Sequence, residues 1–280
     1  MSATASAPAS SGNLGPGFDV LALALEMRCT VTATPTATWE VVELGRSFEP
    51  EPHELVRRAA ELAVGRPLRL EIDNAIPRAR GLGSSSAVAA AIAAASMRAM
   101  GIDPDPNRLF EIVEELEGHG DNAAAAVYGG CVLVSGTQIR QLEIHPSLRF
   151  VVGIPDARLK TDEARAALSP EVDRWAATRN LARFGFLIEG LRTGDPAVLS
   201  VAAGDEMHEA PRAALSAITG SLMDAARRAG AFHAAWSGAG PTAIAIVDEA
   251  GCPAVERAME LVLGEDGVVR CLEVAAQGWL

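Results

Sequence analysis

The stretch PRARGLGSSSAVAAAIAAAS, residues 77–96, places two glycines and three serines directly before an alanine-rich helix. Gly81 and Gly83 leave room for a close approach to the backbone and allow positive φ. The helix that begins near Ser85 offers unpaired N–H groups and the positive end of its dipole. The stretch is therefore either a turn with a helix cap or a cradle for phosphate, and taken alone it favours the two equally.

Neither of the common nucleotide-binding fingerprints explains this loop. No Gly-Lys-Ser/Thr follows, as a Walker loop requires, and Ser86 stands where the dinucleotide pattern has its third glycine. Two further polar, glycine-rich stretches occur, SSGNLGPGFDVLALAL at 10–25 and EELEGHGDNAAAAVYGG at 114–130. Three such constellations are hard to explain as turns, so together they favour the phosphate cradle.

Composition restricts the class of protein. The chain has 280 residues, 49% of them hydrophobic, and a net charge of −12. These values indicate a globular protein of one large or two modest domains, and they argue against nucleic acid or an anionic membrane as partner. The four cysteines are scattered, as expected of free buried thiols. No secretory signal and no membrane-spanning apolar run is visible, so we expect a cytoplasmic protein.

Strands and helices are mixed, without the regular alternation of a doubly wound sheet. This pattern predicts an α+β fold with two subdomains, 1–147 and 148–280, the last strand being a candidate to rejoin the first. The strands are expected near 20–25, 29–34, 39–44, 68–77, 128–136, 149–156 and, as a pair, within 232–248, with a last one in VVRCLEVAAQGWL. The helices are expected near 52–65, 85–100, 107–117, 171–192, 195–203 and 210–229.

The glycine-rich stretches resemble the signature blocks of the GHMP small-molecule kinases, and among these the homoserine kinases. A first block close to S-A-N-L-G-P-G-F-D is matched by residues 11–19, with Gly12 in place of alanine. The P-x3-G-L-G-S-S block is matched by residues 77–85. The E-G-H-P-D-N block is matched by residues 117–122, with Gly120 in place of proline, and S-G-A-G-P-T by residues 237–242 without change. The matches run through nearly the whole chain.

The resemblance implies an activity and a fold. It implies a GHMP kinase fold with the active site in the cleft between two subdomains, and phosphorylation of L-homoserine to O-phospho-L-homoserine in threonine biosynthesis. ATP and Mg²⁺ are the implied cofactors, and a homodimer is the implied assembly. Two alternatives stay open at this point: a GHMP kinase for another alcohol such as mevalonate, a sugar or shikimate, and a non-catalytic relative that binds nucleotide or amino acid.

Homoserine is a zwitterion, so its site needs an anion for the ammonium group and cations for the carboxylate. The resemblance puts Asn13 and Asp19 at the ammonium end. It puts Arg165 and Arg212 at the carboxylate, which a guanidinium grips through two hydrogen bonds. His119, Asn122 and Thr161 resemble residues beside the substrate hydroxyl and the transferring phosphate, and we name no general base.

ATP is expected to lie along the serine loop, and phosphoryl transfer there needs mostly positioning and charge neutralisation. The implied nucleotide-binding residues are Pro77, Arg78, Ala79, Arg80, Gly81, Leu82, Gly83, Ser84, Ser85 and Ser86. Magnesium is expected on Ser85 and a carboxylate of the 109–117 helix. Glu115 aligns best, while Glu111 and Glu117 stay open. Glu54 stands where the family often has asparagine near adenine, which leaves the contacts to the base open.

Overall fold

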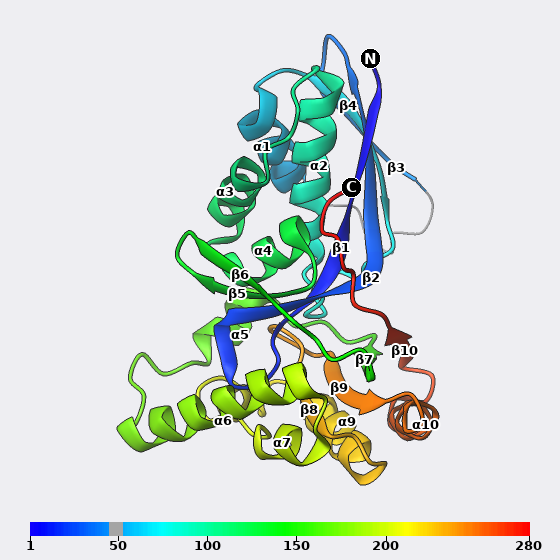
Figure 1. The fold of residues 1–280 in the computed structure, drawn as a ribbon. Helices are drawn as coiled ribbons and strands as arrows, with labels where there is room; N and C mark the ends of the chain where they lie inside the picture. The colour runs from blue at the N-terminus through cyan, green and yellow to red at the C-terminus, as the bar shows by residue number, and fades with distance from the viewer. Residues whose placement is uncertain (45–52) are drawn as a thin grey trace.

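The computed structural model describes residues 1–44 and 53–280, which form two β-sheets and the helices packed on them (Figure 1). The larger sheet has the order β3-β4-β2-β5-β6, with β1 paired to β2, and the smaller has the order β10-β7-β9-β8. The larger sheet consists of β1 Ala3–Asn13, β2 Gly17–Pro35, β3 Glu40–Glu43, β4 Leu68–Asn74, β5 Cys131–Ser135 and β6 Gln138–Leu142. The smaller sheet consists of β7 Leu148–Pro155, β8 His233–Trp236, β9 Ala243–Asp248 and β10 Gly267–Leu272. The expected α+β class is confirmed.

Two groups of helices accompany the two sheets (Figure 1). With the larger sheet lie α1 His53–Val64, α2 Ser84–Ala99, α3 Pro106–Glu117 and α4 Gly120–Tyr128. In the second half of the chain come α5 Thr161–Ala166, α6 Arg174–Thr193, α7 Pro196–Val201, α8 Glu209–Arg212, α9 Ala217–Arg228 and α10 Cys252–Leu263. None of the helices in 1–44 and 53–280 has the length and apolar character needed to cross a bilayer.

Helix α2 is the centre of the larger core. Nearly all of its residues are buried, and it packs against β1, β2, α1 and α3. Its alanines let these neighbours approach closely, while they keep a high helix propensity. The helix therefore holds its N-terminus at a fixed place, between the two sheets.

Several expected elements differ from the observed ones. The strands predicted at 20–25 and 29–34 are one strand, β2, in which Pro8 pairs with Arg28 but Ala9 pairs with Leu25. The skipped residues form a β-bulge and not a turn. β1, β6, α4, α5 and α10 were not expected, and the first residue of the helix predicted at 52–65 lies outside the described residues.

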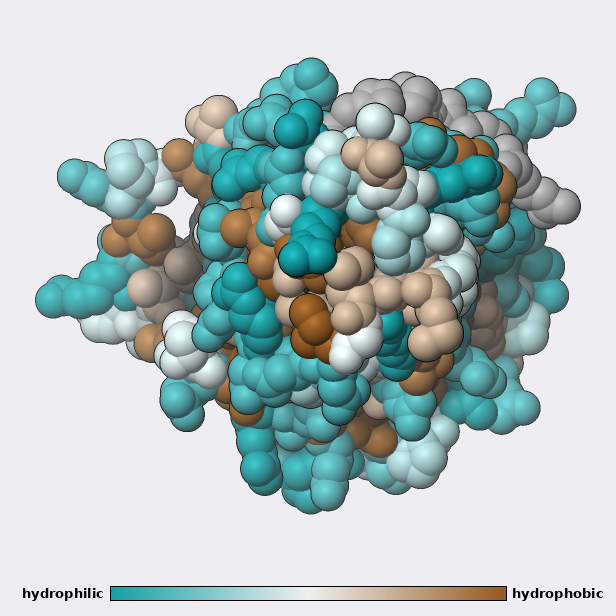
Figure 2. Space-filling view, turned by 90° about the horizontal axis from the view of Figure 1, so that it is seen from above, coloured by the Kyte–Doolittle hydropathy of each residue, from teal (hydrophilic) through white to brown (hydrophobic). Residues whose placement is uncertain are grey.

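The end of the chain returns to the larger sheet. β10 itself pairs with β7 in the smaller sheet, but Val274 bridges Leu25, and Leu280 exchanges backbone hydrogen bonds with Ser6. Figure 1 shows the C-terminus beside β1. Figure 2 shows the end of the molecule where α1 and α2 lie, with hydrophilic residues around a small central group of hydrophobic ones.

Candidate active site

The start of α2 forms one wall of a cleft. Gly83 precedes the helix with φ 61°, and no side chain caps the first turn. A Cβ at Gly83 would collide with the Ser10 hydroxyl, and one at Gly81 with the Ser237 carbonyl, so both positions require glycine. The first N–H groups of α2 are thus left for a ligand, and a helix N-terminus of this kind favours anions.

The cleft has a volume of about 420 Å³, and segments far apart in sequence line it. Most residues that the sequence singled out meet here: Asn13, Asp19, Pro77, Arg78, Ala79, Gly81, Leu82, Gly83, Ser84, Ser85, His119, Asn122, Thr161, Arg165 and Arg212. Glu117, Asp121, Leu159, Lys160, Asp162, Gly238 and Ala239 complete the lining.

Two residues expected at the nucleotide do not line this cleft. The Arg80 guanidinium donates to the backbone carbonyls of Pro155 and Asp156, both at 2.8 Å, and so ties the serine loop to the end of β7. Ser86 is fully buried, and its hydroxyl donates to Glu117. Both side chains are therefore engaged within the protein, and a role of these two residues in nucleotide binding stays a prediction.

The carboxylates considered for the metal differ in position. Glu115 lies on the exposed face of α3, 3.9 Å from Arg58, whereas Glu117 accepts a hydrogen bond of 2.8 Å from the Ser85 hydroxyl. Residues two apart on a helix point to different sides, so only one of the two can reach the serine loop. Glu117, one of the alternatives left open, is therefore the one that contacts the serine loop, and the choice of metal carboxylate stays a prediction.

The three serines differ in what they offer to a ligand. Ser84 accepts from Asn74 and donates to the carbonyl of Ile76, so its hydroxyl is engaged inside the protein. The Ser85 hydroxyl and the Glu117 carboxylate both line the cleft. They are hard oxygen ligands of the kind that Mg²⁺ prefers, so these residues fit a magnesium ion.

An ion pair occupies the substrate side of the cleft. The Arg165 guanidinium donates to both Asp19 oxygens, at 3.0 and 2.8 Å. The Asp19 carboxylate raises the pKa of Arg165. Asn13 fixes the backbone here, because its Oδ1 accepts from the Asp19 N–H and its Nδ2 donates to Gly238. A negative and a positive group thus lie side by side, as a zwitterionic ligand requires.

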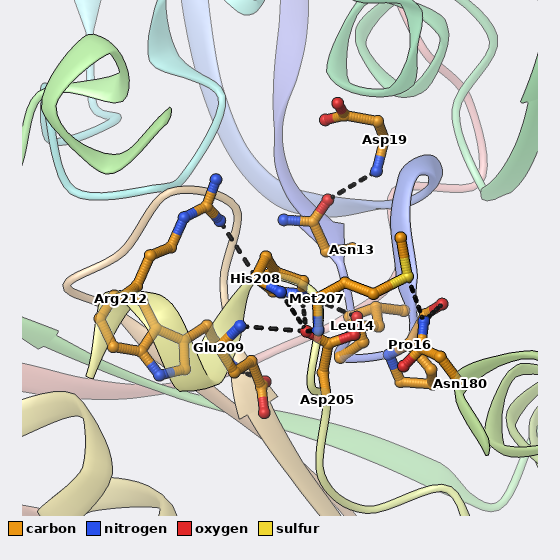
Figure 3. A network of polar contacts seen from close by, with 12 residues as sticks. Asn13, Leu14, Pro16, Asp19, Asn180, Asp205, Met207, His208, Glu209 and Arg212 are labelled. Carbon is orange, nitrogen blue, oxygen red and sulfur yellow. Dashed lines mark hydrogen bonds and ion pairs between the residues drawn. The ribbon is translucent and has the colours of Figure 1, made fainter. Parts of the chain in front are cut away.

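Arg212 enters the same cleft from a buried position (Figure 3). Its Nε donates to the carbonyl of Ala164. Its Nη1 donates to the carbonyl of Gly238 and to Nδ1 of His208. Burial and the neighbouring charge of Arg165 lower the pKa of Arg212. These contacts fix the guanidinium from behind, which orients it toward a ligand in the cleft.

The turn between α3 and α4 supplies a third group of polar side chains. His119 is the N-cap residue of α4, and its Nδ1 lies 3.2 Å from the Asp121 carboxylate, which raises the pKa of His119. Asn122 donates to Asp121 at 3.3 Å and accepts from Ser10 at 2.8 Å. These contacts orient His119 and Asn122 at the cleft wall, and they give Asp121 the part of an orienting group.

Lys160 is a cleft residue that sequence reasoning missed. It is exposed, lines the cleft, and directly precedes Thr161 at the start of α5. The backbone just before it is tied to the serine loop, since Leu159 donates to the carbonyl of Ala79 at 3.0 Å. Its position beside Thr161 in the sequence LKTDEAR could have indicated this, because a cation near the transferring phosphate stabilises negative charge in the transition state.

Known proteins resemble this chain in sequence and in fold. The GHMP kinases N-terminal domain matches residues 53–130, and the GHMP kinases C-terminal domain matches residues 187–262. A homoserine kinase of Deinococcus radiodurans is 37% identical over 264 residues, which cover 90% of this chain and 86% of that one. One of Moorella thermoacetica is 35% identical over 274 residues, covering 93% and 92%. The crystal structure of homoserine kinase from Cytophaga hutchinsonii shares the fold, with a TM-score of 0.88 and 24% identity, over 100% of this chain and 96% of that one.

The fold, the cleft and these matches define a GHMP kinase. Within that class, the identities of 35% and 37% over nine-tenths of the chain mean that it belongs to the homoserine kinase family.

Proposed function

We propose that this chain transfers the γ-phosphoryl group of ATP to the hydroxyl of L-homoserine, giving ADP and O-phospho-L-homoserine. The observation that carries the proposal is the opposed charges of Asp19 and Arg165 in the cleft that also holds the open start of α2. An amino acid has both an ammonium and a carboxylate group to satisfy such a pair. Mevalonate and sugars have no ammonium group, so the charges favour homoserine over these alcohols.

The triphosphate of ATP would lie along Gly81–Ser85, where the free N–H groups of α2 face the cleft. Arg78 and Lys160 line the same cleft and add positive charge. Phosphoryl transfer depends on such positioning and charge neutralisation more than on covalent chemistry by the protein. The contact between Ser237 and Gly81 would hold the loop rigid in this task, because the Ser237 hydroxyl donates to the Gly81 carbonyl at 2.6 Å.

Ser85 and Glu117 are the residues that would hold Mg²⁺. Bound there, the ion would neutralise charge on the β- and γ-phosphates. The Ser85 hydroxyl donates a hydrogen bond of 2.8 Å to the Glu117 carboxylate, so the two oxygen atoms lie close enough for one cation to contact both.

The amino acid would bind by exchanging partners with the existing ion pair. Its ammonium group would meet Asp19, supported by Asn13, while its carboxylate would meet Arg165 and Arg212. Its hydroxyl would then point toward the wall formed by His119, Asn122 and Thr161.

The test is release of ADP by purified protein with ATP and Mg²⁺. L-homoserine is compared with L-serine, L-threonine, mevalonate and galactose. We expect magnesium-dependent turnover with homoserine far above that with the other alcohols. Turnover with another alcohol and none with homoserine would refute the proposed substrate while leaving the phosphate site in place.

We also propose a homodimer, a cytoplasmic location and a division of the chain between residues 147 and 148. Two large exposed apolar residues of α6 support the dimer, Trp175 and Phe186, which are 62% and 44% exposed. They are eleven residues apart, which is close to three helical turns, so they lie on the same side of the helix. Analytical ultracentrifugation decides the assembly, and a monomer at all concentrations would refute it.

A further inference from the structure

His208 lies completely buried between the two groups proposed to bind the amino acid (Figure 3). On one side its Nε2 is 2.8 Å from the carbonyl of Gly15, in the loop between Asn13 and Asp19. On the other side its Nδ1 is 3.1 Å from Nη1 of Arg212. The imidazole thus connects the loop of the ammonium site with the arginine of the carboxylate site.

The partners of the ring determine its tautomer. A carbonyl oxygen can only accept, so the hydrogen bond to Gly15 requires a proton on Nε2. A guanidinium can only donate, so the contact with Arg212 requires Nδ1 without a proton. His208 must therefore be the neutral Nε2–H form, and burial favours this form because it lowers the pKa of His208.

The surroundings fix the position of the ring. It stacks on Phe18, with ring centroids 5.1 Å apart, and the Arg212 guanidinium lies over the same phenyl ring at 5.4 Å. The backbone on which His208 sits is held by Asp205, whose Oδ1 accepts from the N–H groups of His208 and Glu209 at 2.5 and 3.0 Å. A shift of this ring would therefore move Arg212 relative to Asp19.

We infer that His208 is a positioning residue that sets the spacing between Asp19 and Arg212, and thereby the affinity for the amino-acid end of the substrate. This inference rests on the proposed function. It assigns His208 no contact with the reacting atoms, because its two ring nitrogens are both engaged with protein groups.

His233 provides a matched control. It is equally buried, and its Nε2 lies 2.9 Å from the carbonyl of Leu14, the residue before Gly15. Its Nδ1, however, has no hydrogen-bond partner among the described residues. The two histidines thus anchor the same loop, but only His208 reaches Arg212.

The test compares His208→Phe with His233→Phe in steady-state kinetics, varying homoserine and ATP separately. We expect His208→Phe to raise KM for homoserine by about tenfold or more, as the loss of a hydrogen bond to a charged group would. Its kcat and its KM for ATP should change far less. His233→Phe should lower thermal stability and leave KM for homoserine near that of the unchanged protein. Equal effects of the two substitutions on KM for homoserine, or equal changes in both KM values for His208→Phe, would overturn the inference.

Two conservative variants separate the two contacts. His208→Asn keeps an acceptor near the Nδ1 position and should restore most of the affinity for homoserine, whereas His208→Gln keeps the donor to Gly15 and should restore less. If His208→Phe does not fold, ¹⁵N NMR of the unchanged protein still decides, because it must show His208 as the neutral Nε2–H tautomer. An Nδ1–H tautomer or a cation would overturn the inference. Failure of the proposed function would appear separately, as lack of homoserine turnover by the unchanged protein.

A second, independent observation concerns a pair of thiols that do not line the cleft. Cys252 begins α10 and is buried, Cys271 lies on β10 and is exposed, and their Sγ atoms are 2.9 Å apart. This separation is less than 1 Å above the roughly 2.05 Å length of an S–S bond, so the two sulfur atoms are close to bonding distance. The geometry points to a disulfide formed by exchange with an oxidised small-molecule disulfide such as glutathione disulfide.

The exchange would begin at the exposed thiol. The Cys271 thiolate attacks one sulfur of glutathione disulfide and releases one glutathione, and the Cys252 thiolate then displaces the second from the mixed disulfide. Two protein thiols are oxidised and one glutathione disulfide is reduced to two glutathione molecules. Burial and the neighbouring Cys271 raise the pKa of Cys252 to about 12, which makes Cys252 the second of the two to react.

Intact mass spectrometry after incubation with glutathione disulfide tests this pair. We expect a loss of two hydrogens and two cysteines still open to alkylation after denaturation, and a glutathione adduct in Cys252→Ser, which retains the exposed thiol. A stable glutathione adduct on the unchanged protein, or no reaction at all, would overturn it.

Discussion

Glu209 is a buried carboxyl group whose titration should be visible in the stability of the protein. It is 6% exposed, and burial raises its pKa to about 7 from an ordinary 4.5. Its Oε1 accepts a hydrogen bond of 2.8 Å from the Trp236 N–H. Glutamine keeps this acceptor but cannot ionise, so Glu209→Gln removes the titration while it preserves the contact.

The sign follows from the direction of the shift. A pKa that is higher in the folded state means that folding favours the protonated form. Its stabilising contribution is complete below the unfolded pKa of 4.5 and is lost as the pH rises through about 7. One pKa unit corresponds to about 1.4 kcal/mol, so this group removes about 3 kcal/mol from the free energy of unfolding across that interval. The glutamine variant lacks this loss.

Urea unfolding of both proteins, followed by circular dichroism from about pH 5 to about pH 8, measures the difference. The free energy of unfolding of Glu209→Gln should gain about 2 to 3 kcal/mol relative to the unchanged protein over that range. The buried His233, whose pKa burial lowers to about 4, titrates in both proteins and cancels in the difference. Glu206 is a control, because Arg179 and Arg183 lower its pKa to about 2. Its stabilising contribution is lost only as the pH falls below its unfolded pKa of 4.5, so Glu206→Gln should leave the pH dependence from about pH 5 to about pH 8 unchanged. Parallel pH curves for Glu209→Gln and the unchanged protein would refute the reasoning.

Other substitutions test the cleft. Ser85→Ala and Glu117→Gln should each lower kcat by about a hundredfold in magnesium-dependent ADP release, because each would remove a proposed metal ligand. Glu115→Gln should stay near the unchanged rate. A larger loss for Glu115→Gln than for Glu117→Gln would favour Glu115 as the metal ligand. Asp19→Asn should raise KM for homoserine about tenfold with KM for ATP unchanged, since it removes the charge for the ammonium group and the ionic partner of Arg165, both on the amino-acid side of the cleft. Equal effects on both KM values would contradict this. Gly81→Ala should lower the melting temperature, because it combines a φ of 74° with a collision at the Ser237 carbonyl, at a cost of about 1 to 3 kcal/mol; an unchanged melting temperature would show that the loop tolerates a side chain.

Local signals made much of the cleft predictable. Gly81 and Gly83 adopt the left-handed φ that the sequence pattern predicts, and the helix begins within a residue of the expected place. Such features depend on a few adjacent residues, so they can be interpreted without knowledge of the rest of the fold. The motif blocks then named which distant segments should meet at the cleft.

Features that depend on long-range packing could not be predicted. β1, with the sequence ATASAPASSGN, has few residues that favour strands, and it exists because β2 pairs with it along its length. α4 has nine residues, too short to be stable alone, and it forms in a buried site. The sequence alone could not decide whether Glu115 or Glu117 contacts Ser85, because the choice depends on where α3 ends. The contact of His208 with Gly15 could not be predicted either, because Gly15 lies 193 positions earlier in the chain.

The ion pair of Asp19 and Arg165 has a consequence for how the two substrates respond to ionic strength. The two side chains neutralise each other before a ligand binds. A zwitterion that pairs with both of them leaves the net charge of the cleft unchanged. Few counterions are displaced in such an exchange, so affinity for the amino acid should vary little with added salt. ATP carries several negative charges to a helix end and nearby cations, and its affinity should fall as salt screens them. Salt would thus act as a selective control on one of two ligands that share a single cleft.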